Sequence, residues 1–331
     1  MLTPAYKLTI GKKTVDSAKE PQASTLVELI VSLDLERSAD SVTVVLGQVG
    51  GQLTPALRDK AAIELGYADG GALTQVIAAE VVSVEPNLNT ERIVGFTAAE
   101  TLLRSYINET FEDRTAGAIV RDLAGRVKVS VASAEDGISF PFYVIDGRRS
   151  FLRHMRDLAD LSGFDLYFNN QGRLVFEKFA KPKSLHVLEH AKDMLEVRLT
   201  RSIPIAAPVQ AWGESPADRK GEGASAWLTK NFGGSKGVAG SGKPVLLLER
   251  PTLRTRTAAN TAALADEARI QHSTVQGRLL SVGRPEVKLG DAIQVRAVPD
   301  GSLNKTFQVR AVTHRLTKRG GFTTEIGFRG I

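Results

Sequence analysis

The 331-residue sequence contains no cysteine, only 6% aromatic residues and no long apolar run. The absence of cysteine excludes disulfides, thiolate metal ligands and a cysteine nucleophile, and it is typical of proteins assembled in a reducing compartment. The amino terminus lacks the apolar segment of a signal peptide, and nowhere do ~18 apolar residues follow one another as a membrane span requires. We therefore expect assembly in the bacterial cytoplasm and no membrane insertion by this chain.

The excess of basic residues is small. The 43 Lys and Arg outnumber the 37 Asp and Glu by six, and the isoelectric point is about 9.5. This balance permits an anionic partner, but most proteins with so small an excess simply have a solvated basic face. At ~150 residues per domain, the length indicates about two domains, each large enough for its own core.

The first hundred residues have the pattern of short strands. Apolar residues alternate with polar ones, most clearly at Val42, Val44 and Leu46, as in strands with one buried face. Glycines occupy the gaps between these segments, where turns need positive φ. The pattern predicts a barrel or sandwich with strands at 7–10, 25–33, 41–46, 74–85 and 91–96.

The middle of the chain changes to a helical period. A short helix is expected from about Thr97, and Thr115 and Gly125 bound a second. The clearest helix runs from Ser150, its N-cap, to Gly163, with apolar residues three and four apart. A hairpin at 164–177 follows, with turn residues at 169–172. This region predicts a small α/β unit.

Strand patterns return toward the carboxyl end, at 195–201, 208–212, 291–298, 305–313 and 322–328. Residues 213–243 contain eight glycines and predict a mobile loop, and an alanine-rich helix is expected at 257–273. The predicted fold is a β-rich α+β protein: two similar antiparallel β-barrel domains, at 1–104 and 184–331, with an α/β insert at 105–183.

Two short motifs match catalytic signatures without the required context. His186, Glu189 and His190 form the H-x-x-E-H pattern of some zinc proteases, but no long amphipathic helix carries them. We expect a polar linker there, and a zinc hydrolase remains an alternative. Residues 237–244 nearly match a phosphate-binding loop, but Pro244 stands in place of its hydroxyl residue, where a helix would have to begin. The sequence therefore predicts no metal, no cofactor and no catalytic residue.

Basic residues crowd the last strands. They interleave with few aromatics, unlike the stacking surfaces of nucleic-acid readers, so a solvated or channel-facing surface is the favoured interpretation. A basic nucleic-acid-binding module stays open as an alternative. The residues are Lys305, Arg310, Arg315, Lys318 and Arg319.

The order of segments resembles a known family. The runs at 93–104, 108–110 and 116–124, then 150–163 followed by 172–176, are similar to the middle of the phage late control protein D family. The carboxyl end, at 287–295, 307–314 and 321–328, is similar to that family's closing barrel. These segments are spread over nearly the whole chain.

The resemblance implies a non-enzymatic baseplate hub of a contractile phage tail or phage-tail-like injection system. Three copies would form a ring that joins a hexameric inner tube to a trimeric spike and lines a channel for DNA or an effector. The implied partners are two further copies, the inner-tube or tube-initiator protein, other baseplate proteins and a separate spike. A separate spike is expected because the chain ends at Ile331, where related valine-glycine repeat spike proteins continue into a needle.

Overall fold

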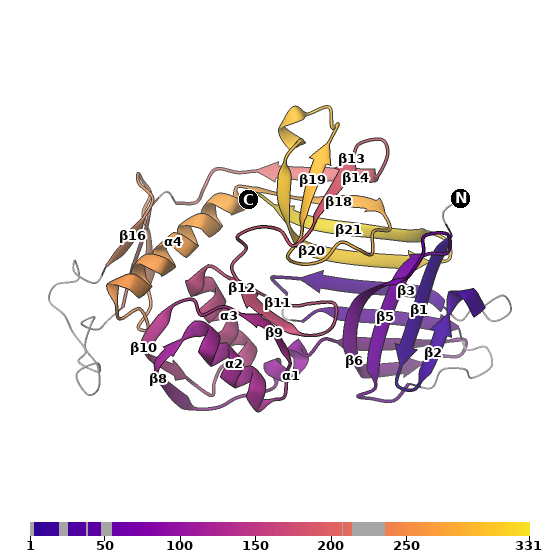
Figure 1. Cartoon of the computed structure of the whole chain (residues 1–331), viewed down its shortest axis with the longest axis horizontal. Helices are drawn as coiled ribbons and strands as arrows, with labels where there is room; N and C mark the ends of the chain where they lie inside the picture. Colours follow the sequence, from indigo (N-terminus) through magenta and orange to yellow (C-terminus); the bar gives the residue numbers. More distant parts are fainter. Residues whose placement is uncertain (1–2, 20–25, 38, 48–54, 207, 214–235) are drawn as a thin grey trace.

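The computed structural model describes residues 3–19, 26–37, 39–47, 55–206, 208–213 and 236–331. One 13-stranded sheet dominates these residues (Figure 1). The β-rich α+β prediction is confirmed. The strands of this sheet are β1 (Pro4–Ile10), β2 (Lys13–Asp16), β3 (Leu26–Asp34), β4 (Ser41–Gly47), β5 (Lys60–Tyr67), β6 (Thr74–Pro86), β7 (Thr90–Phe96), β13 (Leu185–Glu189), β14 (Met194–Arg201), β18 (Val275–Val282), β19 (Ala292–Arg296), β20 (Thr306–Thr317) and β21 (Gly321–Arg329).

The two ends of the chain share this sheet. Its main path runs β14-β18-β21-β20-β3-β4-β7-β6-β5-β1-β2, so β20 and β3 join the carboxyl-terminal strands to the amino-terminal ones. They pair antiparallel, with Val312 opposite Leu33 and His314 opposite Val31. The expectation of two separate closed barrels is corrected: within the described residues, the pairing closes neither set of strands. Alternation fixes which face is buried but not which edges meet.

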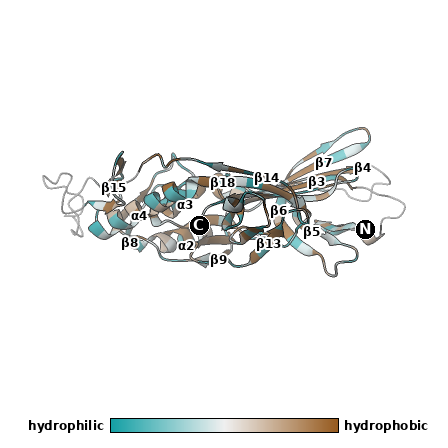
Figure 2. Ribbon diagram, turned by 90° about the horizontal axis from the view of Figure 1, so that it is seen from above, coloured by the Kyte–Doolittle hydropathy of each residue, from teal (hydrophilic) through white to brown (hydrophobic). Residues whose placement is uncertain are grey.

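The inner face of the sheet forms the first core. Leu29, Val31 and Leu33 of β3 are buried with Val312 and Leu316 of β20, and the residues that alternate with them on β3 are more exposed. Figure 2 shows the sheet at one end of an elongated molecule and the helices at the other. None of the described helices is both long and apolar enough to cross a membrane.

The middle of the chain folds as the predicted α/β unit. β8 pairs with β10, and β9, β11 and β12 form a second small sheet. The helix predicted at 150–163 is α3, and it ends at Gly163, whose φ of +69° favours glycine. Gly125 does not end α2 as predicted, because the helix continues to Arg126. The elements are α1 (Ala99–Leu103), β8 (Glu109–Thr115), α2 (Ala116–Arg126), β9 (Val131–Ala134), β10 (Ser139–Ile145), α3 (Phe151–Ser162), β11 (Asp165–Phe168) and β12 (Leu174–Glu177).

A later part of the chain completes the core of this unit. Ala259, Ala262 and Ala263 of α4 are buried with Leu158 of α3 in the second core. Of the predicted glycine-rich loop, residues 214–235 lie outside the described residues, and 237–239 form a strand. The domain boundaries proposed from the sequence stay a prediction. The elements are β15 (Val209–Trp212), β16 (Gly237–Ala239), β17 (Leu246–Glu249) and α4 (Arg256–Ser273).

Helix α4 has a side-chain cap that can be tested. The Thr255 hydroxyl oxygen accepts a hydrogen bond of 3.1 Å from the backbone N–H of Ala258. We expect Thr255→Ala to lower the free energy of unfolding by about 1 kcal/mol, because this N–H loses its partner. Urea denaturation measures the change. Thr255→Ser keeps the oxygen and should cost less than half as much; equal losses for both variants would contradict a capping role.

Candidate functional site

The H-x-x-E-H motif lies on a strand. His186 and Glu189 belong to β13, which pairs in parallel with β19, so the expected polar linker is corrected to a strand of the main sheet. His186 Nε2 lies 2.9 Å from Asp291 Oδ2, a carboxylate that also accepts from the Lys288 N–H. Zinc proteases need these histidines one helical turn apart. Within the described ranges, no group of three metal-ligating side chains occurs.

The segment that resembles a phosphate-binding loop also lacks its helix. Residues 237–239 form β16, which pairs with β15, and the next helix, α4, begins only at Arg256. A phosphate-binding loop needs a helix N-terminus directly after the glycines, so that backbone N–H groups point at the phosphates. The local structure here therefore offers no such cradle.

The five predicted basic residues spread along β20. Arg310 and Arg315 are five residues apart within the strand, Lys305 precedes it, and Lys318 and Arg319 lie in the turn to β21. At ~3.3 Å per residue, the two ends of this set lie about 40 Å apart. Arg315 pairs with Glu28 at 2.6 Å. That these five side chains face a polyanion stays a prediction.

Arg310, one of these five basic residues, points toward the α/β unit. The register between β20 and β21 shifts between Val309 and Ala311, so Arg310 is the extra residue of a β-bulge. Bulges redirect a side chain relative to the regular alternation. The Arg310 side chain, 15% exposed, reaches toward the α/β unit and bonds Asp165 of β11 at 2.6 Å.

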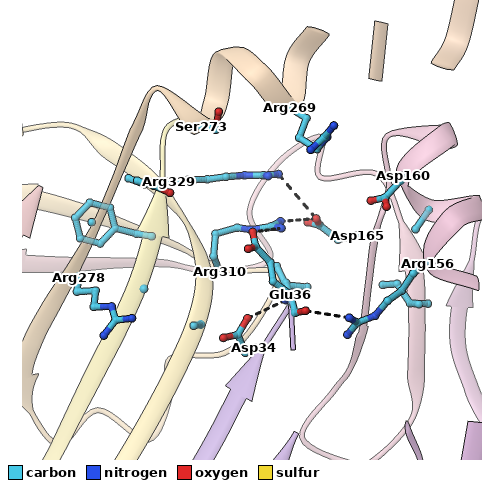
Figure 3. A pocket seen from close by; sticks show the side chains of 18 of the residues that line it. Asp34, Glu36, Arg156, Asp160, Asp165, Arg269, Ser273, Arg278, Arg310 and Arg329 are labelled. Carbon is cyan, nitrogen blue, oxygen red and sulfur yellow. Dashed lines mark hydrogen bonds and ion pairs between the residues drawn. The ribbon is translucent and has the colours of Figure 1, made fainter. Parts of the chain in front are cut away.

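A cleft of about 920 Å³ opens where the sheet faces α3, β11 and α4 (Figure 3). We call it the arginine cleft. Strands β14, β18, β20 and β21 form one wall, and the α/β unit forms the other. Six arginines and four acidic residues line it: Arg156, Arg198, Arg269, Arg278, Arg310, Arg329, Asp34, Glu36, Asp160 and Asp165.

Asp165 is the central carboxylate of the cleft. It is buried, and it accepts hydrogen bonds of 2.6 Å from both Gln308 Nε2 and Arg310 Nη1. Arg329 Nη2 lies 4.0 Å from the same carboxylate (Figure 3). Asp165 thus joins the α/β unit to the two last strands of the sheet.

Arg329 is a mostly buried cation of the cleft whose nearest carboxylate is distant. Its side chain is 18% exposed, and in the described part of the chain Asp165 is the only carboxylate within 4.0 Å of it. Burial, and next the charge of Arg310, lower the pKa of Arg329 to about 10. Its Nε donates to Gln308 Oε1 at 2.9 Å, which leaves the outer nitrogens to face the cleft.

No local pattern in the sequence predicts the arginine cleft. Its charged residues are separated by up to 295 positions along the chain. They come from α3, α4, β11, β14, β18, β20, β21 and the segment around the end of β3. The sequence marks Arg310 as one of the basic residues of the last strands, but nothing in it marks its partner Asp165. Only strand pairing and docking of the α/β unit bring the two together.

A second surface feature is the unpaired edge of the sheet at β14. Among the described strands β14 pairs only with β18, so its other edge is open. Leu195 on β14 is 58% exposed, and Ile203 and Ile205, directly after the strand, are 88% and 78% exposed. An open edge beside exposed apolar side chains favours pairing with another chain.

Comparisons with known proteins identify the fold. No family model matches the sequence, and no curated protein matches it either. A 43 kDa tail protein of prophage MuSo2 from Shewanella oneidensis is similar in structure, with a TM-score of 0.72 over 98% of both chains at 14% identity. A tail protein from Neisseria meningitidis gives 0.73, over 99% of this chain and 96% of that one, at 13% identity.

A third similar structure comes from Escherichia coli. That protein is described as a component of the type VI secretion system with structural similarity to bacteriophage T4 tail proteins. Its TM-score is 0.63 at 10% identity, over 98% of this chain and 77% of that one. The chain therefore has a fold shared by phage tail proteins and a secretion-system component, along its whole length.

Proposed function

We propose that this chain is the structural baseplate hub of a contractile phage tail or of a phage-tail-like injection system, related to the phage late control protein D family. The observation that carries the proposal is the similarity of fold to tail proteins over 98% or more of this chain. The match covers almost the entire chain, so a tail-protein fold accounts for nearly all of its residues.

In this proposal the chain assembles as a homotrimer. A threefold ring needs a heterologous interface, in which one surface of a subunit meets a different surface of the next. The main path of the sheet ends in β14 on one side and β2 on the other, so each subunit offers two unlike edges. Burial of Leu195, Ile203 and Ile205 against a neighbouring copy would add an apolar contribution at the first edge.

The ring would adapt a hexameric inner tube to a trimeric spike. The proposed partners are the inner-tube or tube-initiator protein, a separate spike and other baseplate proteins, and DNA or an effector would pass the channel. Assembly would take place in the bacterial cytoplasm, and the product would be part of a virion tail or injection particle. The role is non-enzymatic; the strand location of His186 disfavours the zinc-hydrolase alternative.

Self-association tests the proposal. We expect the purified chain, alone or with its spike partner, to have a mass in sedimentation experiments of three times the 35.7 kDa of one chain. Replacing Ile203 and Ile205 together by aspartate should weaken association at least tenfold, because two carboxylates would be buried at the edge.

Leu88→Asp is the matched control. Leu88 is 92% exposed in the turn between β6 and β7, away from the β14 edge, so the same change in charge and polarity should leave the mass unchanged. A chain that stays monomeric at micromolar concentration, with and without the spike partner, would overturn the proposed hub role.

A further inference from the structure

We propose that the arginine cleft binds an acidic segment of a partner protein, by inserting its carboxylates between Arg329 on the floor and Arg278 at the mouth. This inference does not depend on trimer formation, and it assigns a site to residues that the proposed hub role does not use. The argument rests on charge, on the geometry of the donors and on the shape and lining of the cleft.

The counter-ions of the cleft are unevenly distributed. Arg198, Arg269 and Arg278 pair with Glu196, Asp266 and Glu325, and Arg310 pairs with Asp165, whereas Arg329 has no carboxylate closer than 4.0 Å among the described residues. Asp165 is engaged by Arg310 at 2.6 Å and lies 4.0 Å from Arg329. A mostly buried positive charge without a close counter-ion is costly, so an anion beside Arg329 stabilises the site.

The guanidinium N–H groups of the cleft are well suited to bind carboxylates. Arginine presents N–H groups in a planar fork that binds a carboxylate through two parallel hydrogen bonds. The outer nitrogens of Arg329 face the cleft from β21, and the neighbouring strand β18 contributes Arg278 (Figure 3). Arg278 pairs with Glu325 only at 3.5 Å and is 74% exposed, so it can turn to a ligand at small cost.

The lining favours a peptide over a nucleic acid. The volume of about 920 Å³ suits a few amino-acid residues, and Leu35, Phe164 and Leu166 provide apolar surface beside the arginines. A nucleic-acid backbone carries negative charge at every phosphate and would meet Glu36, whose side chain is 75% exposed at the cleft. A peptide that alternates acidic and apolar residues matches both features.

A binding experiment with the whole chain tests the inference. The probe is a fluorescently labelled hexapeptide of alternating Glu and Leu, titrated by anisotropy. We expect saturable binding that weakens at least tenfold in Arg329→Gln and about threefold in Arg278→Gln. Arg278→Gln, at an exposed position, keeps the test valid if Arg329→Gln does not fold. A hexapeptide of alternating Gln and Leu should not bind.

The matched control is Arg92→Gln. Arg92 on β7 is exposed and paired with Glu85, outside the cleft, so this variant loses the same charge and should change affinity less than twofold. Equal weakening by Arg92→Gln and Arg329→Gln, or undiminished binding in both cleft variants, would overturn the inference. Tighter binding of a single-stranded oligonucleotide with the same dependence on Arg329 would also overturn it and make the cleft a nucleic-acid site.

Discussion

Replacing Asp165 by alanine is expected to lower the free energy of unfolding by about 3–5 kcal/mol, the usual cost of leaving a buried charge unpaired. Asp165 accepts from Gln308 and Arg310 at 2.6 Å each and is the only carboxylate within 4.0 Å of Arg329 in the described residues. Without it, two mostly buried guanidinium groups would repel each other, and the buried Gln308 amide would lose its acceptor.

Urea denaturation measures this change, and Asp165→Asn is its control. Asparagine keeps the size of the side chain and one acceptor oxygen but removes the charge. Asp165→Asn should therefore lower the free energy of unfolding, but by less than Asp165→Ala does. The contact joins the α/β unit to β20, so the loss should also separate the unfolding of the two cores. A loss below 1 kcal/mol for Asp165→Ala would mean that Glu36, 3.4 Å from Arg310, replaces Asp165.

The stability of the chain is expected to depend on two buried groups that respond to pH in opposite directions. Burial raises the pKa of Asp40 to about 7. Burial also lowers the pKa of His314 to about 3. Asp40 accepts from the Asp34 N–H at 2.8 Å, and His314 shares a hydrogen bond of 3.0 Å with Thr324.

The direction of each pH effect on stability depends on whether the folded or the unfolded chain binds the proton more tightly. The folded chain holds the Asp40 proton more tightly than the unfolded chain, so its contribution to stability is complete below pH 3.8 and is lost as pH rises to about 7. For His314 the folded chain binds the proton less tightly, so stability is present above pH 6.5 and is lost as pH falls toward 3. At about 1.4 kcal/mol per pKa unit, each contribution is about 4–5 kcal/mol.

Two variants separate these contributions. In the wild type they largely offset each other between pH 4 and pH 6.5. Asp40→Asn should leave the His314 contribution, so that the free energy of unfolding falls steeply on acidification. His314→Gln should leave the Asp40 contribution, so that the same free energy rises on acidification. Denaturation series at several pH values measure both slopes, and parallel pH profiles for the two variants and the wild type would contradict this assignment.

Local structure was predicted well where one pattern dominates. The alternation at 41–46 predicted β4, and the apolar stripe with its terminal glycine predicted α3. By contrast, the segment of β13 is predicted as a polar linker, because no long amphipathic helix carries its H-x-x-E-H pattern. Its strand conformation comes from pairing with β19, more than a hundred residues later in the chain.

The arginine cleft shows the limit of the sequence most clearly. Arg310 was recognised only as one of several basic residues near the carboxyl end. Its direction depends on a bulge opposite β21, and its partner Asp165 lies 145 positions away. Neither the bulge nor the docking of β11 leaves a repeating signal in the chain.

Where a local period is clear, as in β4 and α3, the amino-acid sequence alone fixes which residues are buried, because side-chain direction follows periods of two and 3.6 residues. From that came the β-rich α+β class and the α/β unit in the middle. The pairing of β3 with β20 and the meeting of arginines from distant elements beside Asp165 depend on tertiary packing. Strand edges expose the same backbone N–H and C=O groups whatever their side chains, so partners are selected by the packing of the whole chain.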